Sequence, residues 1–158
     1  MKPFTEVCLR IGGDGMNPEL CAGVNPKICT DILGITPDIQ LTIGEPLSMT
    51  HDIGIKRRTS VWMYSTENRI KNDDPFDPIP HVNHIIQLFS GKRHLFDRIR
   101  NIGNVRISIC VTWGVQHGSY TFDNQLIQTI LDMGIDEVRH IFVSVDDEEE
   151  NNATQTNV

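Results

Sequence analysis

The sequence predicts a single α+β domain whose core has the ferredoxin-like βαββαβ order, extended by a final helix and strand. Two observations lead to this prediction. Hydrophobic and polar residues alternate over several short segments, which is typical of strands that pack on one face. Segments with helical spacing of hydrophobic residues lie between them, so the helices would cover that one face. With 158 residues the chain is long enough to bury one core, and we expect an antiparallel or mixed sheet of about five strands within residues 1–145.

The first strand and the first helix have clear local signals. Residues 7–11 alternate between hydrophobic and other side chains, and glycines follow them, which predicts a strand ended by a tight turn. Asn25 is a favoured N-cap and Pro26 suits the first helical position, so a helix is expected to begin there. Gly34 is placed to end it.

Two further strands are expected over residues 39–43 and 59–66. In the second of these, Trp62 and Tyr64 share one face. Core packing is the main interpretation of these two aromatic residues, and a patch that binds an anion or a protein is the alternative.

A loop rich in proline and aspartate, residues 72–80, precedes the next helical pattern. Hydrophobic residues recur at helical spacing over 82–89 and again over 95–102. Ser90 and Gly91 lie between these segments, so we expect the helix to break or kink there.

The last third of the chain predicts a strand, a helix and a strand. Large hydrophobic residues occupy every second position from 105 to 113, which makes this the clearest strand of the sequence. A short helix is expected to begin at Asp123 and to end at Gly134. The final strand is expected over residues 138–145.

The net charge is −7 and the pI is near 5.2, which argues against nucleic acid as a partner. Five of the 21 acidic residues are consecutive, at 146–150; the remaining 16 face 14 basic residues, so the folded body is close to neutral. Polar residues follow this run, and residues 146–158 are therefore predicted to be a disordered acidic tail. No hydrophobic run has the length of about 20 residues that a membrane span needs, so no membrane association is expected.

The cysteines show no metal-binding spacing. Cys8, Cys21, Cys29 and Cys110 form no C-x-x-C pair, and no secretory signal is evident at the start of the chain. The simplest interpretation is four reduced thiols in a cytoplasmic protein. Cys8 and Cys110 fall within predicted strands, where free cysteine usually serves as a small buried hydrophobic residue.

No set of residues converges on a reaction. The glycines of residues 12–15 follow a strand but lack the G-K-[ST] ending of a phosphate-binding loop and the spacing of a dinucleotide-binding motif. His81 and His84 lie three residues apart without an adjoining glutamate, so we expect no metal site, and no cofactor is predicted. There is no G-x-S-x-G nucleophile motif. The sequence predicts a protein that is not an enzyme.

The candidate binding residues are charged and aromatic residues in or beside loops. They comprise a carboxylate after the first strand, a basic cluster before the third strand, and an aromatic residue that leads into a glycine-bounded loop containing a histidine. For each position the alternative is a plain turn, solvated charge or core packing. The six candidates are Asp14, Lys56, Arg57, Arg58, Trp113 and His117.

The order of several short motifs resembles the bacterial domain-of-unknown-function family 4279. The motifs are Asp14, the segment from Asn25-Pro26 to Pro37, the Gly44-Glu45-Pro46 step, the Trp62 strand, and the closing helix and strand from Leu126 to Val145. Residues 15–23 depart from the pattern as an insertion. The resemblance covers about residues 6–145. It implies a small bacterial cytoplasmic α+β protein, supplies no catalytic residues, and suggests a setting in toxin immunity or defence.

These observations favour a non-enzymatic protein-binding domain, immunity-like or antitoxin-like, that neutralises a partner such as a toxin or another basic protein. An acidic domain would meet a basic surface with favourable electrostatic steering. One alternative is a small-ligand or anion-binding domain that uses the six candidate residues. Another is a self-associating structural module, a homodimer formed where the last strand leaves an open sheet edge.

Overall fold

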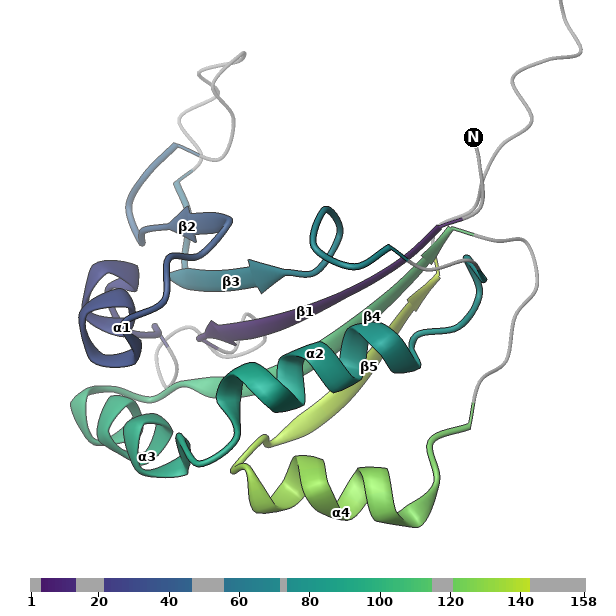
Figure 1. Ribbon diagram of the computed structural model, residues 1–158. Coiled ribbons are helices and arrows are strands. Elements are labelled where there is room, and N and C mark those ends of the chain that lie inside the picture. The colour runs from purple at the N-terminus through teal and green to yellow at the C-terminus, as the bar shows by residue number, and fades with distance from the viewer. Residues whose placement is uncertain (1–3, 14–21, 47–55, 72–73, 115–120, 143–158) are drawn as a thin grey trace, which may run out of the picture.

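The computed structural model describes residues 4–13, 22–46, 56–71, 74–114 and 121–142 (Figure 1). The predicted acidic tail, residues 146–158, lies outside these ranges, as do residues 143–145 of the predicted final strand. None of the described helices is long and apolar enough to cross a membrane. In chain order the elements are β1 (Phe4–Gly12), α1 (Pro26–Leu33), β2 (Ile39–Leu41), β3 (Val61–Ser65), α2 (Ile79–Phe89), α3 (Arg93–Ile102), β4 (Arg106–Gly114), α4 (Asn124–Asp132) and β5 (Glu137–Phe142).

The five strands form one mixed sheet in the order β2-β3-β1-β4-β5. The pairs β2–β3, β1–β3 and β1–β4 are antiparallel, which is the strand arrangement of the ferredoxin-like βαββαβ unit. The final helix and strand add β5 parallel to β4 at one edge. The predicted α+β class and the mixed five-stranded sheet are therefore confirmed.

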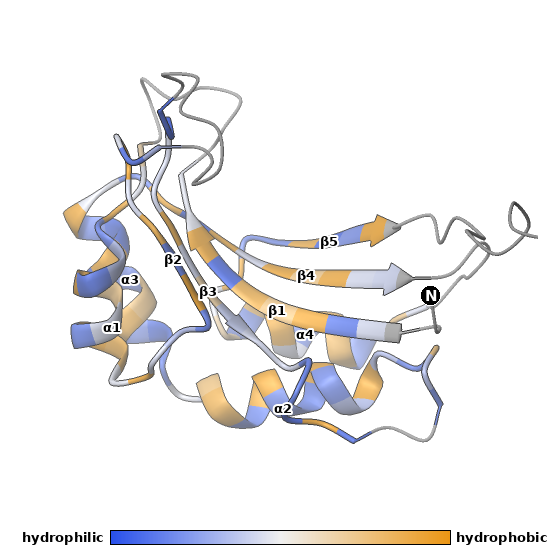
Figure 2. Ribbon diagram, turned by 90° about the horizontal axis from the view of Figure 1, so that it is seen from above, coloured by the Kyte–Doolittle hydropathy of each residue, from blue (hydrophilic) through white to orange (hydrophobic). Residues whose placement is uncertain are grey.

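The two faces of the sheet differ in what covers them. Figure 2 shows α2 and α4 lying along one face, with α1 and α3 together at one end. Among the elements that the structure describes, none lies on the opposite face. The register places one hydrophobic row of each central strand under the helices; the fully buried members of this row are Val7, Leu9, Ile11, Trp62, Ile107, Ile109 and Val111.

The helix ends follow the local signals of the sequence. The Asn25 side chain caps α1 by accepting from the Lys27 N–H, and the Asp123 side chain caps α4 by accepting from the Leu126 N–H. Gly34 ends α1 with φ of 67°, a conformation that favours glycine. Between α2 and α3, Gly91 has φ of 73°, so the predicted break is a real turn.

Aromatic packing joins the helices to the sheet. Phe89 of α2 is fully buried and contacts Trp62 and Tyr64 of β3 edge to face, with ring centroids 6.4 and 5.9 Å apart. Its ring stacks on Phe96 of α3 at 5.9 Å. The predicted core role of Trp62 and Tyr64 is correct, since the two side chains are 0% and 6% exposed.

A buried polar contact ties the segment after β3 to β1 and α2. The Thr66 hydroxyl donates to the Val7 carbonyl at 2.7 Å and accepts from the Val7 N–H at 3.2 Å. It also lies 2.7 Å from His81 Nδ1. Because a hydroxyl has a single proton, Nδ1 is the donor of this last bond. Burial lowers the pKa of His81, the charge of His84 lowers it further, and the charge of Asp77 opposes the shift.

Replacing Phe89 should test the aromatic packing. Phe89→Ala removes a ring that three others surround, so we expect a loss of about 3–5 kcal/mol in the free energy of unfolding, measured by urea denaturation. Phe76→Ala is the control, because Phe76 is 49% exposed and should change stability little. Equal effects of the two substitutions would contradict the packing described.

The buried His81 predicts a pH dependence of stability. The folded state holds a neutral imidazole, whereas the unfolded chain binds a proton near the usual pKa of 6.5. The stabilising contribution is therefore complete above pH 6.5 and is lost as the pH falls toward the lowered folded pKa. His81→Asn keeps a donor for Thr66 and should flatten the decrease in unfolding free energy between pH 7 and pH 5, measured by urea denaturation. His94→Asn, at an exposed position of α3, should leave the wild-type slope; a slope that both variants share would refute the role of His81.

Candidate functional site

The structure describes four of the six candidate binding residues. Asp14 and His117 lie outside the described residues. Lys56 and Arg58 are exposed and Arg57 is half-buried in the segment that leads to β3. Backbone hydrogen bonds anchor that segment, since the Arg57 N–H donates to the Glu45 carbonyl and the Arg57 carbonyl accepts from the Gly44 N–H.

Trp113 lies far from this basic cluster. It pairs with Thr5 at one end of β1, whereas Val61, which follows the cluster, pairs with Gly12 at the other end. The seven residue steps from Thr5 to Gly12 span about 23 Å of strand. The described candidates therefore do not form one cluster, and a binding role for each stays a prediction.

Trp113 belongs to the interior rather than to a contact surface. Its side chain is 4% exposed and lies edge to face against His140 of β5, with ring centroids 6.0 Å apart. His140 also contacts Phe122, which precedes α4, at 5.8 Å. Phe122 and His140, but not Trp113, line a recess between α4 and β5.

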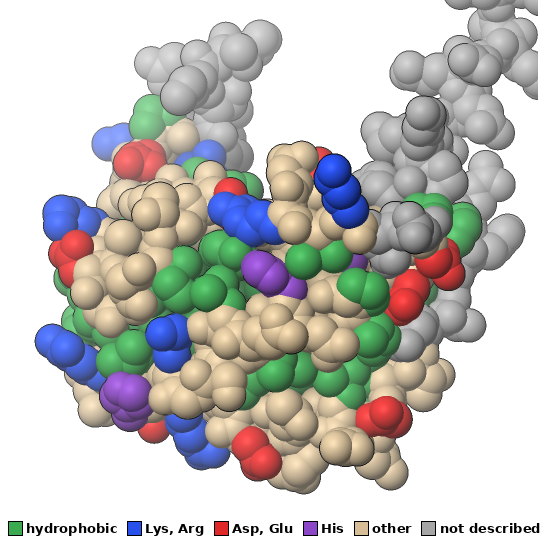
Figure 3. Space-filling model, in the orientation of Figure 1, with side chains coloured by type: hydrophobic (Ala, Val, Ile, Leu, Met, Phe, Trp, Pro, Cys, Tyr) green, Lys and Arg blue, Asp and Glu red, His purple; other side chains and the backbone are tan. Residues whose placement is uncertain are grey.

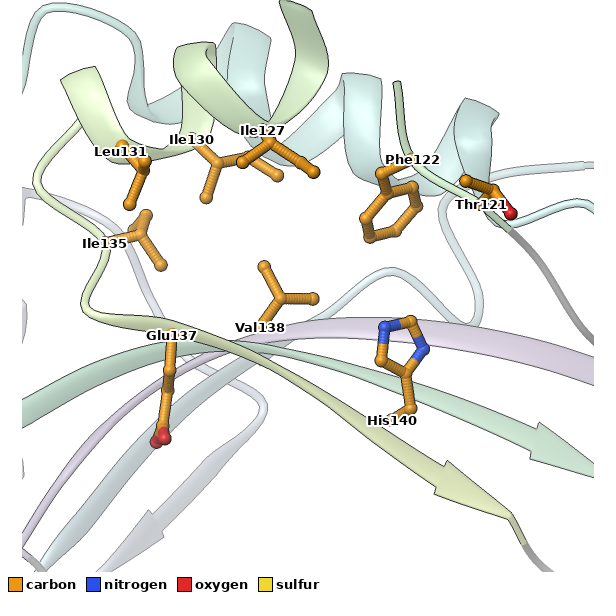
Figure 4. Close-up of a pocket in the computed structure, with 9 residues that line it drawn as sticks. All are labelled: Thr121, Phe122, Ile127, Ile130, Leu131, Ile135, Glu137, Val138 and His140. Carbon is orange, nitrogen blue, oxygen red and sulfur yellow. The ribbon is translucent and has the colours of Figure 1, made fainter. Parts of the chain in front are cut away.

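The recess has a volume of about 440 Å³ and is lined mainly by hydrophobic side chains. Ile127, Ile130 and Leu131 of α4 face Val138 of β5 across it (Figure 4). The Glu137 carboxylate points away from the recess, so the polar groups that remain at it are the His140 imidazole and the Thr121 hydroxyl. Such a lining suits an apolar group with one or two hydrogen-bonding atoms.

The position of α4 beside the last strand produces this recess. Ile130 is buried in the core, but Ile127 and Leu131 on the neighbouring flank of the helix are 41% and 50% exposed. In the described sheet β5 pairs with β4 alone, so no strand extends beyond it to cover that flank. Figure 3 shows hydrophobic side chains between α2 and α4 on the side of the molecule that carries the helices. We call the recess, Ile127, Leu131 and the outer edge of β5 together the α4–β5 surface.

Arginines of neighbouring segments pair with acids near the α4–β5 surface. Residues 121–142 contain four acids and one arginine. Asp136 is partly neutralised, because its carboxylate accepts from the Ile107 N–H at 2.7 Å and pairs with Arg100 at 3.0 Å. Arg93 donates to the Asp132 carbonyl at the end of α4. Glu137 pairs with Arg139 and lies 3.6 Å from Arg106, so two of the four acids are paired with arginines.

The described residues do not assemble a metal site. Within the described ranges no group of three or more His, Cys, Asp or Glu residues is placed to hold a metal ion. His81 and His84, the pair considered from the sequence, point to different partners, since His84 Nε2 lies 2.9 Å from the Tyr64 hydroxyl and His81 binds Thr66.

The sequence did contain one sign of the α4–β5 surface. Leu126-Ile127 and Ile130-Leu131 are adjacent hydrophobic pairs four residues apart, and they make the hydrophobic stripe of α4 wider than one packed face needs. Which flank stays uncovered depends on the sheet order, and that order was not evident from the helix itself.

Comparison with known proteins gives one match. The model of a family described as Domain of unknown function (DUF4279) matches residues 4–138, which span β1 through the start of β5. No curated protein and no solved structure matches significantly. The match covers most of the chain, and the protein belongs to the DUF4279 family.

Proposed function

We propose that this domain binds another protein through the α4–β5 surface. The observation that carries the proposal is the apolar recess beside an unpaired strand edge of the described sheet. A partner can add a strand to such an edge by main-chain hydrogen bonds and place a hydrophobic side chain in the recess. Ile127 and Leu131 lie beside it as exposed hydrophobic contacts.

The charge of the domain supports a basic partner. The whole chain has a net charge of −7, and five of its acids are consecutive at residues 146–150. Opposite charge would steer an acidic chain to a basic surface of another protein, and on this ground we propose that it inhibits that partner in an immunity-like or antitoxin-like role. Cys8, Cys29 and Cys110 are free thiols, which supports a reducing compartment such as the bacterial cytoplasm.

Substitutions on α4 test the proposed binding surface. The partner is isolated on the wild-type domain at low salt, purified, and titrated against variants by calorimetry. Leu131→Asp and Ile127→Asp should weaken binding about thirtyfold, the effect of a residue that contributes roughly 2 kcal/mol at an interface. Both positions are exposed, so the fold should persist. Ile102→Asp is the matched control, because Ile102 is 51% exposed on α3 and does not line the recess.

Three results would contradict this proposal. The first is a partner whose affinity is unchanged by both α4 substitutions. The second is a partner bound equally weakly by the Ile102→Asp control. The third is a dimer by light scattering that dissociates on Leu131→Asp, which would instead favour self-association through the β5 edge.

A small apolar ligand is the second candidate function, and the volume of the recess favours it. At about 440 Å³ the recess falls within the range of about 300–1,000 Å³ typical of small-molecule sites. Its hydrophobic lining and the single imidazole of His140 would suit a largely apolar molecule.

Filling the recess separates the two candidates. If a ligand is the natural occupant, the wild-type domain should bind the neutral probe Nile red with one site, and Val138→Phe should weaken this binding at least about tenfold. Val138 lines the recess, and fluorescence titration measures the change. Val105→Phe, at a half-buried position outside the recess, is the control. Absence of saturable binding to the folded wild-type domain would refute the ligand function and leave protein binding.

A further inference from the structure

Two thiols face each other on the sheet face that carries no described helix. Cys8 of β1 and Cys110 of β4 are direct partners in the antiparallel register. Their side chains are hydrogen-bonded to each other, both thiols are free, and they are 4% and 3% exposed. Directly opposed residues of an antiparallel pair have Cα atoms about 4.5–5.5 Å apart, within the span that a disulfide bridges. The backbone therefore already holds the two cysteines at the separation that a disulfide requires.

Two arginines make the two thiols unequal. Arg139 of β5 is the register partner of Cys110, and Arg10 lies two residues after Cys8 on the same face. The hydrogen bond from Cys8 lowers the pKa of Cys110, and the charges of Arg10 and Arg139 and the Ser108 hydroxyl lower it further against the effect of burial. The same hydrogen bond, together with burial, raises the pKa of Cys8. Of the two thiols, Cys110 is therefore the one that loses its proton more readily.

Figure 2 shows no described helix over this face of the sheet. Because the two cysteines are nevertheless buried, neighbouring side chains must shield their sulfurs. Arg10 is half-buried: its Nη2 donates to the Gly13 carbonyl at 3.4 Å, and its buried Nη1 has no hydrogen-bond partner within the described part of the chain. Arg139 is held by Glu137, with Nε 2.6 Å from Oε1. Long arginine side chains have many rotamers, so we expect their motion to admit a small reagent such as hydrogen peroxide to the thiols.

Cys29 provides a contrast within the same protein. It is 1% exposed on α1, and burial raises the pKa of its thiol to about 11. No cysteine is its partner in the register of the described strands. Cys29 is therefore expected to stay unreactive, and it serves as an internal control.

We propose that Cys8 and Cys110 form a peroxide-reactive dithiol site that closes to a cross-strand disulfide. The Cys110 thiolate attacks one oxygen of hydrogen peroxide, the O–O bond breaks, and the departing hydroxide takes up a proton to become water. Cys110 is then a sulfenic acid. Cys8 attacks its sulfur, the S–O bond breaks, the S–S bond forms, and the oxygen leaves with the Cys8 proton as a second water. The dithiol loses two electrons and the peroxide gains them. This site lies on the opposite face from the recess and does not depend on the proposed binding function.

The first test maps the disulfide in the wild-type protein. The full chain is treated with hydrogen peroxide under native conditions, the remaining thiols are blocked, and the peptides are analysed by mass spectrometry. A linkage between the peptides of Cys8 and Cys110 is expected, with a mass loss of about 2 Da and with Cys29 still reduced. A dithiol reductant should reverse the change.

Single variants test the two roles. Cys8→Ala removes the resolving thiol, so Cys110 should stop at the sulfenic acid and be trapped by dimedone. Cys110→Ala should leave Cys8 unlabelled, and Cys29→Ala should still form the wild-type linkage. Arg139→Gln removes a positive charge beside Cys110 and should raise the pKa of that thiol. At a pH below this pKa, a rise of one unit in the pKa makes the thiolate about tenfold scarcer but also more nucleophilic. The net result should be oxidation that is about threefold slower. Arg98→Gln, at an exposed position of α3, should not change the rate.

Each of three results would overturn the proposal. One is a folded wild-type protein that forms no Cys8–Cys110 linkage in peroxide. Another is equal or faster oxidation of Cys29. The last is dimedone labelling of Cys8 in Cys110→Ala without labelling of Cys110 in Cys8→Ala. The mapping of the wild-type protein needs no substitution, so it decides the question even if a variant fails to fold.

Discussion

The pairing of β1 with strands on both of its sides is the constraint on which the rest of this structure depends. β1 is the central strand, hydrogen-bonded to β3 and β4, and its residues alternate strictly between the two faces. A shift of one residue would exchange Leu9 for Cys8 under the helices and expose the hydrophobic row. The segment after β3 reinforces the register, because Thr66 bonds both backbone polar groups of Val7. The aromatic cluster around Phe89 then joins the helices to the face that this register defines.

This register gives the two faces different chemistry. On the helix-bearing face, hydrophobic packing continues as far as β5, which is the edge strand of the described sheet. One flank of α4, with Ile127 and Leu131, is left uncovered there. The recess forms there because β5 covers only part of the hydrophobic face of α4. On the opposite face the same alternation gathers cysteine, serine and arginine from three strands into adjacent rows. Binding and thiol reactivity are therefore assigned to opposite sides of the same strands.

Much of the fold was predictable because its signals are local. The period of two over residues 105–113, the Asn25-Pro26 start of α1 and the left-handed Gly34 each depend on neighbouring residues alone. The candidate site was not predictable in the same way. In the sequence, Trp113 and the basic residues 56–58 look alike because each lies beside a loop. In the structure they lie at opposite ends of β1, and Trp113 is buried in the core. The recess and the Cys8–Cys110 pair depend on sheet order and register between distant segments, which periodicity does not report.

Native-state hydrogen exchange at the amides of β5 in the free protein tests the proposed binding surface most directly. Because β5 bonds to β4 on one side only, alternate amides should face outward and exchange orders of magnitude faster than the amides of β1 and β4. We predict this alternating pattern along Glu137–Phe142. Uniformly slow exchange along β5, equal to that of β4, would mean that the edge is already covered in the free protein. That result would contradict an α4–β5 surface that is available to a partner.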